Sequence, residues 1–182
     1  MVFITTQGSA ENLMPNWVES KLHVAKGDSS EVFEFIRSEE SVVDFNNILP
    51  MPADVAARAS EQEEAAPVLT LGDGTTVKAI WYPEKCIELE WNRQNWGTKW
   101  NSRYAGYSAK DPEHVIEFAT AWSPPVPIFE ALAKRFPDHK IVINSDDDNM
   151  CYHAIFTLEN GQMKERARTQ RKREPRKGEV AQ

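Results

Sequence analysis

The chain has 182 residues, a hydrophobic content of 41% and a net charge of −7, which together predict one folded domain with a packed core. No stretch approaches the roughly 20 consecutive apolar residues of a membrane-spanning helix. The N-terminus lacks the basic and apolar regions of a secretory signal, so we expect a cytoplasmic protein. The only cysteines, Cys86 and Cys151, form no C-x-x-C pair, which argues against a disulfide framework or a zinc ribbon.

The charge is distributed unevenly along the chain. Residues 164–182 contain eight Lys or Arg and three Glu, a net charge of +5, so the rest of the chain carries −12. An acidic body repels phosphate at long range. Residues 163–182 show no apolar periodicity, which predicts a disordered basic tail. Such a tail either adds salt-dependent affinity for RNA or DNA or serves only solubility; the nucleic-acid interpretation assigns contacts to Arg166, Arg168, Arg171, Lys172 and Arg173.

The first third of the domain predicts three elements. Residues 18–24 alternate between apolar and polar side chains, which indicates a half-buried strand. Residues 32–36 place their apolar side chains on one helical face after a capping Asp28 or Ser29, so a helix is expected up to about residue 40. Residues 45–52 end in two prolines and are expected to form a short edge strand.

Residues 53–112 are irregular and are expected to form an insertion. Residues 53–66, rich in Ala and Glu, predict a solvated helix, and residues 68–71 and 75–81 predict a hairpin. For residues 86–91, a helix opened by Pro83 competes with a strand, because the apolar side chains fit both periods.

The last third is more regular. Residues 115–122 predict a strand, Ser123 is expected to cap a helix that ends at Pro137, and residues 140–144 and 150–158 predict two further strands. This order predicts an α+β protein with a ferredoxin-like antiparallel sheet. Two helices cover one face, and the Trp-rich insertion lies between the second and third core strands.

Four peptides resemble signatures of one family, and they occur in the same order. They are residues 14–17 (MPNW), 47–52 (NILPMP), 95–100 (NWGTKW) and 120–125 (TAWSPP). The chain thereby resembles the YubB ferredoxin-like domain family. The resemblance implies a ferredoxin-like domain over residues 14–162, a phage or plasmid origin and no particular activity. Residues 1–13 and the basic tail depart from the family pattern, so we expect the former to be either an extension or the result of an upstream start.

A cluster of tryptophan, lysine and arginine is the strongest candidate binding site. Flat aromatic side chains beside cations can stack a base or hold a partner's side chain. The competing interpretation, which we favour from sequence, is a structural lid in which the insertion covers the sheet face that lacks helices. The cluster comprises Trp91, Asn95, Trp96, Lys99, Trp100, Arg103 and Trp122.

Other motifs favour structural roles. Residues 122–125 could present helix N-terminal amides to an anion, but a capped turn is simpler. Residues 146–149 lack the spacing of a calcium loop, which favours a solvated hairpin tip. The four histidines are dispersed, although His23 and His153 could approach on the open face if the first and last strands paired. We therefore expect no metal, no cofactor and no catalytic residues.

Three functions stay open at this stage. The first is a non-enzymatic binding or inhibitory protein of a mobile element that acts on a host protein, possible because an acidic surface can imitate nucleic acid. The second is an RNA- or DNA-binding accessory protein that uses the basic tail and the tryptophans. The third is an enzyme acting on a nucleotide-like ligand, which requires Lys99, Arg103 and a His or Asp to converge. The sequence predicts neither an oligomeric state nor the identity of the partner.

Overall fold

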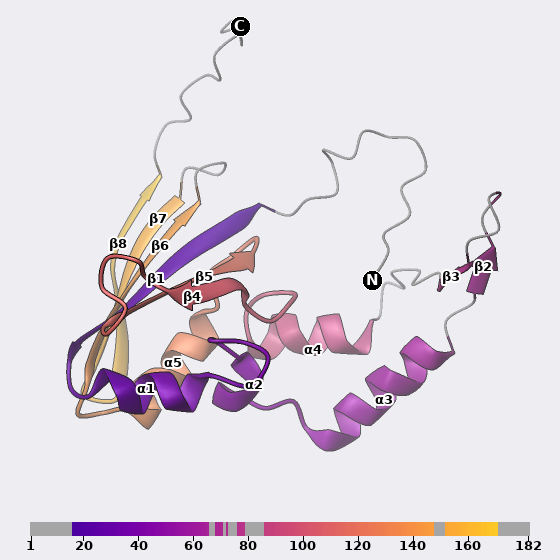
Figure 1. Ribbon diagram of the computed structural model, residues 1–182, viewed down its shortest axis with the longest axis horizontal. Coiled ribbons are helices and arrows are strands. Elements are labelled where there is room, and N and C mark those ends of the chain that lie inside the picture. The colour runs from indigo at the N-terminus through magenta and orange to yellow at the C-terminus, as the bar shows by residue number, and fades with distance from the viewer. Residues whose placement is uncertain are drawn as a thin grey trace, which may run out of the picture.

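The computed structural model describes residues 16–65, 68–70, 72, 76–78, 86–147 and 152–170. Most of these form two layers, a six-stranded antiparallel sheet and a layer of helices packed against one of its faces (Figure 1). Within this part of the chain no helix has the length and apolar character needed to cross a membrane.

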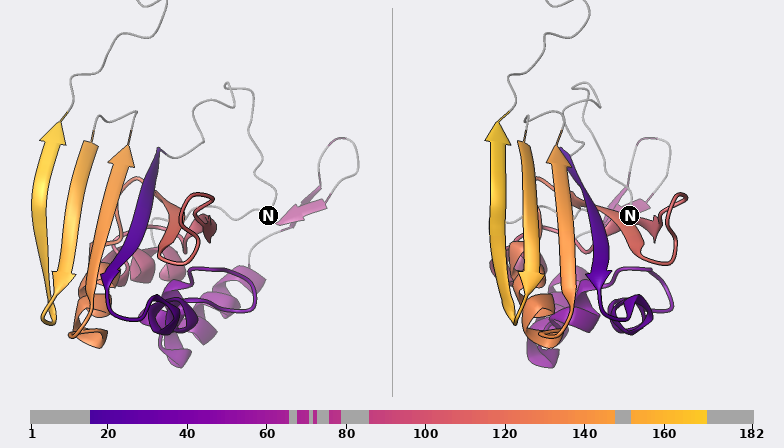
Figure 2. Two further views of the ribbon diagram at one scale, coloured as in Figure 1. Left: turned by 60° about the vertical axis from the view of Figure 1, so that its left-hand side comes forward. Right: turned by 90° about the vertical axis from the view of Figure 1, so that its left-hand side faces the viewer.

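The sheet is built around β1 (Trp17–Lys26), whose alternating burial follows the sequence pattern. It pairs antiparallel with β5 (Val115–Ala121) on one side and with β6 (Lys140–Asp147) on the other. The edge next to β5 is β4 (Arg103–Tyr107). On the other side β7 (Tyr152–Glu159) and β8 (Gln162–Gln170) extend the sheet beyond β6 (Figure 2).

Two interleaved crossovers define the topology. The helix α1 (Ser29–Ile36) links β1 to β4 with β5 between them, and α5 (Val126–Arg135) links β5 to β6 with β1 between them. This order, β4-β5-β1-β6, is the double split β-α-β of the ferredoxin-like fold. The predicted fold class is confirmed, and β7 and β8 are additions at one edge.

The core lies between the sheet and α1 and α5. Every second side chain of β1 from Val18 to Val24 faces the helices. Ile116 and Phe118 of β5 and Phe156 of β7 belong to the same buried cluster. Phe129 of α5 packs against Phe156 with ring centroids 5.2 Å apart. Each such side chain contributes about 1.5–3 kcal/mol on burial, so the core stabilises the layered arrangement.

The predicted edge strand at residues 45–52 is wrong. Its first residues form the one-turn helix α2 (Phe45–Ile48), because Asp44 accepts a hydrogen bond from the backbone of Asn46 at 2.9 Å. Phe45 is fully buried against Phe118. The second core strand is β4, so the irregular segment lies between α1 and β4 and not between the second and third core strands.

Within that segment two predictions are confirmed. The helix α3 (Ala53–Glu64) buries none of its residues, and in Figure 1 it leads away from the sheet. The short strands β2 (Val68–Thr70) and β3 (Thr76–Lys78) pair antiparallel as the expected hairpin. The helix α4 (Ile87–Asn95) decides between the two alternatives at residues 86–91 in favour of a helix.

The predicted disordered tail is wrong for residues 163–170. They belong to β8, which pairs with β7 along its length, and Met163 packs against the core. The charged side chains hid this strand, because an edge strand tolerates charge where a central strand does not. Arg166 and Arg168 are thus strand residues, whereas Arg171, Lys172, Arg173 and the expected extension 1–13 lie outside the described residues.

Candidate functional site

Trp96, which follows α4 directly, is a structural anchor. Its side chain is 3% exposed and packs edge-on against Phe45 and Trp91, with ring centroids 5.8 and 5.4 Å apart. The indole nitrogen Nε1 donates a hydrogen bond to the backbone oxygen of Leu49 at 2.9 Å. Because Phe45 contacts the helix-covered side of the sheet, Trp96 fills the helical layer. The predicted lid over the open sheet face is therefore wrong.

Two asparagines of α4 stabilise the turn that follows Trp96. Asn95 donates from Nδ2 to the backbone oxygen of Trp91 at 2.9 Å. Asn92 is fully buried and donates from Nδ2 to the backbone oxygen of Lys99, also at 2.9 Å. Asn95 and Trp91 thus help to stabilise the turn, which fixes the direction of the chain after α4.

Residues 97–102 form a loop that is tied to the end of β5. Gly97 has a φ of +77°, a left-handed conformation that favours glycine. Its backbone oxygen accepts a hydrogen bond from Ser123 Oγ at 2.7 Å, and Thr98 Oγ1 donates to the backbone oxygen of Ala121 at 3.0 Å. The predicted helix cap at Ser123 is therefore wrong: its hydroxyl is used by this loop, and Pro125 occupies the N-cap position of α5 without a side-chain bond.

An aromatic rim forms where β1 begins, β4 begins and β5 ends. We define it as Trp17, Trp100, Tyr104 and Trp122. Trp17 is the link, with ring centroids 6.2 Å from Trp100 and 5.5 Å from Tyr104. Tyr104 is 80% exposed and Trp122 is 46% exposed. Exposed aromatic side chains that gather at one place, unlike single ones, indicate a surface that contacts another molecule.

The two most exposed rings of the rim stand on unusual backbone. Tyr104 has a φ of +54° and Trp122 a φ of +71°, in the left-handed region that bulky residues seldom adopt. Such conformations cost about 1–3 kcal/mol each and persist only where the surroundings hold them. Trp122 is held by a 2.8 Å hydrogen bond from its backbone nitrogen to the oxygen of Asn16. Strain of this kind is typical of functional surfaces.

Three cations accompany the rim. Lys99 Nζ lies 5.6 Å from the ring centroid of Trp122, within the range of a cation–π interaction. Partial burial lowers the pKa of Lys99, and the charge of Arg93 lowers it further. Arg103 is exposed on β4. Among the described residues, none of these three cations forms an ion pair with a carboxylate.

The open face of the sheet carries paired charges. Lys21 Nζ and Glu117 Oε1 are 3.1 Å apart, and His153 Nδ1 lies 2.6 Å from Asp146 Oδ1. The hydrogen bond from Lys21 is the main cause of a lowered pKa at Glu117. His23 lies on β1 opposite Val142 and so is remote from His153; the hypothesis that these histidines approach is wrong, because β6 separates β1 from β7.

The two acidic side chains at the end of β6 do not converge. Asp146 faces His153, whereas Asp147 is 2% exposed and lies on the opposite face of β6. Asp148 and Asn149 lie outside the described residues. In the part of the chain that the structure covers, no group of three His, Cys, Asp or Glu side chains could hold a metal ion.

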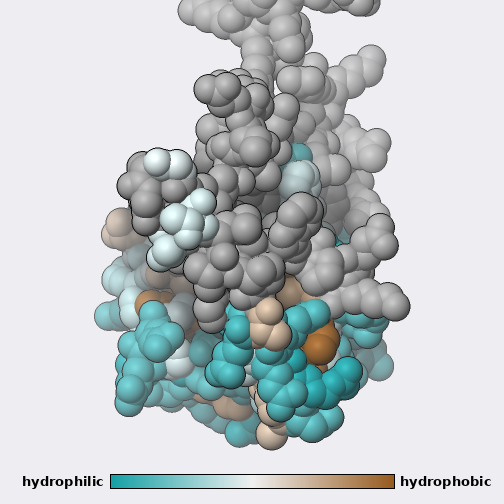
Figure 3. All heavy atoms as spheres, turned by 90° about the vertical axis from the view of Figure 1, so that its right-hand side faces the viewer, coloured by the Kyte–Doolittle hydropathy of each residue, from teal (hydrophilic) through white to brown (hydrophobic). Residues whose placement is uncertain are grey.

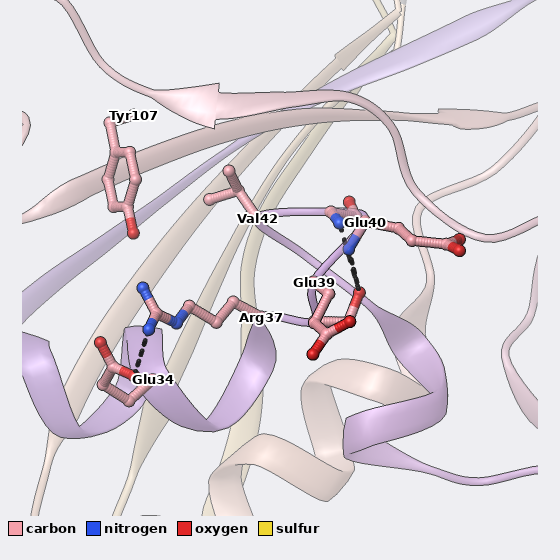
Figure 4. A pocket seen from close by; sticks show the side chains of 8 residues that line it. Glu34, Arg37, Glu39, Glu40, Val42 and Tyr107 are labelled. Atoms are coloured by element: carbon pink, nitrogen blue, oxygen red, sulfur yellow. Dashed lines mark hydrogen bonds and ion pairs between the residues drawn. The ribbon is translucent and has the colours of Figure 1, made fainter.

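A separate hollow of about 640 Å³ lies beside the C-terminal end of α1 (Figure 4). Tyr107 of β4 points its hydroxyl toward Arg37 there, and Arg37 Nη2 is bonded to Glu34 Oε2 at 2.9 Å. The other carboxylates that line this hollow, Glu39 and Glu40, lie in the loop after α1 and are exposed. The residues that line it, none of which the sequence singled out, are Glu34, Arg37, Ser38, Glu39, Glu40, Ser41, Val42 and Tyr107.

The structure divides the predicted cluster into two groups. Trp91, Asn95 and Trp96 belong to the helical layer. Lys99, Trp100, Arg103 and Trp122 lie at the sheet end, where Trp17 and Tyr104 join them. Trp17 belonged to one of the quoted peptides, but nothing in the sequence pointed to Tyr104. From the right-hand side of Figure 1, the described surface is mostly hydrophilic and hydrophobic residues form only small spots (Figure 3).

The four peptides that carry the family resemblance meet at this site. Asn16 accepts from the backbone of Trp122, Thr98 donates to Ala121, Ser123 donates to Gly97 and Trp96 donates to Leu49. Each hydrogen bond therefore joins two of the four peptides. Together they fix the end of the sheet on which the aromatic rim stands.

Comparison with known families agrees with this architecture. No curated protein and no solved structure matches the chain. Residues 95–172, somewhat under half of the chain, match the family model described as the ferredoxin-like domain in Api92-like protein. The matched segment runs from the end of α4 to β8 and includes most of the rim. This match and the strand order agree on a ferredoxin-like fold for the chain.

Proposed function

We propose that the protein is a non-enzymatic binding protein whose contact surface is the aromatic rim. The observation that carries this proposal is the exposure of Tyr104 and Trp122, 80% and 46%, at one end of the sheet, where the backbone of Trp122 is hydrogen-bonded to Asn16. Trp, Tyr and Arg are the residue types that dominate the energetics of binding surfaces. The rim itself consists of Trp and Tyr, and Arg93, Lys99 and Arg103 accompany it.

Preorganisation supports a binding role. The rings stand on strand ends and on a loop tied down by Ser123 and Thr98, so binding does not have to order this segment. Ordering a mobile side chain costs about 0.5–1.5 kcal/mol on binding, and a fixed rim avoids most of that cost. The strained backbone at Tyr104 and Trp122 fits the same interpretation, because it turns the rings toward solvent.

The biological setting follows from the resemblance. We place the protein in the YubB group of mobile-element proteins and in the cytoplasm of a bacterial host, where it serves a phage or plasmid as an accessory protein. An inhibitory contact with a host protein fits the acidic body, since the chain outside residues 164–182 carries a net charge of −12. A counter-defence role belongs to the same proposal.

Site-specific photo-crosslinking tests the rim directly. A benzophenone amino acid replaces Tyr104, Trp122 or, as a matched control, Tyr107, which lies on the same strand as Tyr104 and is 46% exposed. In cells that carry the parent phage or plasmid, we expect adducts from positions 104 and 122 and none from 107. Protease and nuclease treatment of the adducts identifies the class of partner. Absence of adducts at both rim positions, or equal yields at all three, would contradict the proposal.

A further inference from the structure

We infer, on the basis of the binding function proposed above, that the aromatic rim binds a short segment of single-stranded nucleic acid. Its bases stack on Tyr104 and Trp122, and its phosphates lie against Lys99, Arg93 and Arg103. The two kinds of side chain that such a ligand requires, exposed flat rings and cations free of carboxylates, occur together at this end of the sheet.

The rings provide stacking surfaces of suitable geometry. Tyr104 contacts Trp17 at an interplanar angle of 75° and is 80% exposed, so most of its ring surface is open to solvent. Trp122 is 46% exposed, and Lys99 Nζ lies 5.6 Å from the centroid of its ring. Every base has a flat face, so stacking on such rings tolerates many sequences. Bases in a duplex are stacked on one another, and the rim therefore selects for single strands.

The cations favour an anionic ligand over a neutral one. Lys99 and Arg93 are close enough to repel each other, and Lys99 is also partly desolvated, which together lower its pKa. An anion placed between them would offset their mutual repulsion and favour the charged form of Lys99. Arg103 lies opposite Ala119 of β5; Glu117, two residues along that strand, is hydrogen-bonded to Lys21 and Ser108, and Glu19 is two strands away, roughly 10 Å at the usual strand spacing.

The acidic body limits the length of the bound segment. Its distant charges are screened beyond about 8 Å at physiological ionic strength, so a phosphate at the rim interacts mainly with the three cations and with Glu19, which shares a face of β1 with Trp17. A longer strand would cross the open face, where Glu19, Asp146 and Glu117 lie. We therefore expect a site of a few nucleotides, without affinity for duplex.

Fluorescence anisotropy with the full chain tests this inference. The probes are fluorescein-labelled oligo(dT) and oligo(rU) of twelve nucleotides, a duplex of equal length and an oligoglutamate peptide of equal charge. We expect both single strands to bind at low salt, and the duplex and the peptide to bind at least tenfold more weakly. The two single strands show whether the sugar is distinguished.

Three substitutions locate the site. Tyr104→Asn and Trp122→Asn remove the rings while keeping a residue that tolerates left-handed backbone, and each should weaken binding about tenfold to a hundredfold. Tyr107→Asn is the matched control and should leave the affinity unchanged. Lys99→Gln should lower the slope of log affinity against log salt by about 0.7. Circular dichroism of each variant verifies the fold.

Each outcome discriminates between explanations. If single strands bind but neither Asn substitution at the rim weakens them, another segment carries the affinity and the inference is overturned. If the oligonucleotides fail to bind while photo-crosslinks form at positions 104 and 122, the rim is a binding surface for protein; the inference fails and the proposed function stands. If neither is seen, both fail.

Discussion

Substitution of Trp96 by Phe tests whether Trp96 stabilises the fold without taking part in binding at the rim. Phe retains edge-on packing against Phe45 and Trp91 but removes the Nε1 donor to Leu49. Loss of that hydrogen bond costs about 1 kcal/mol. The missing atoms leave a cavity of roughly 40 Å³, which at about 24 cal/mol per Å³ costs about 1 kcal/mol more. We expect the free energy of unfolding to fall by about 2 kcal/mol.

Urea unfolding followed by circular dichroism measures this change as a lower midpoint at an unchanged slope. Binding of the labelled single strand under native conditions should be unaffected, because Trp96 is 3% exposed. The matched variant Trp122→Asn should show the reverse, stability within about 0.5 kcal/mol of the wild type and weakened binding. A stable Trp96→Phe protein that has lost binding would refute the assignment of Trp96 as an anchor.

Three further variants test the fold. Gly27→Ala should lower the free energy of unfolding by more than about 1 kcal/mol, because Gly27 has a φ of +100° and a Cβ there would lie 2.2 Å from His139 Cδ2. Thermal melts measure this change, and Gly106→Ala, whose added Cβ would meet no atom within 4 Å, is the control. Above pH 4.5, the ordinary pKa of this carboxyl, Glu117→Gln should lower the free energy of unfolding by at most about 1 kcal/mol, because the pKa of Glu117 is lowered in the folded state. This difference between wild type and variant should disappear as the pH falls through the lowered pKa of the folded state. Deletion of residues 164–182 should destabilise the protein, since it removes most of β8, whereas a truncation that begins after β8 should not; equal melting temperatures would contradict this assignment of the edge strand.

Truncation experiments on the basic segment have to respect β8. A deletion that starts at residue 164 removes strand pairing with β7 as well as positive charge, so a loss of nucleic-acid binding would have two explanations. Truncation after Gln170 also removes positive charge but leaves β8 intact. The difference matters because Arg166 and Arg168 lie on an edge strand, while the rim lies near the opposite edge, beside β4.

Local patterns in the sequence were sufficient for the central elements. Alternation predicted β1 because its side chains lie alternately on the core and on the open face, and Asp28 predicted the start of α1 because its carboxylate accepts from the backbone of Ser30. The order of strands and helices then limited the topology to the ferredoxin-like arrangement. These features depend on periodicity and capping, which neighbouring residues express by themselves.

Tertiary packing decided the rest. Phe45 enters a helix because the buried rings of Phe118 and Trp96 surround it, and β8 forms because β7 offers an unpaired edge. Trp96 and Trp100 are close in sequence, but Trp96 is buried in the helical layer whereas Trp100 belongs to the aromatic rim. Tyr104 joins Trp17 only because β5 pairs with both of their strands. Contacts between residues far apart in the chain leave no trace in a local pattern, so the rim became visible only in three dimensions.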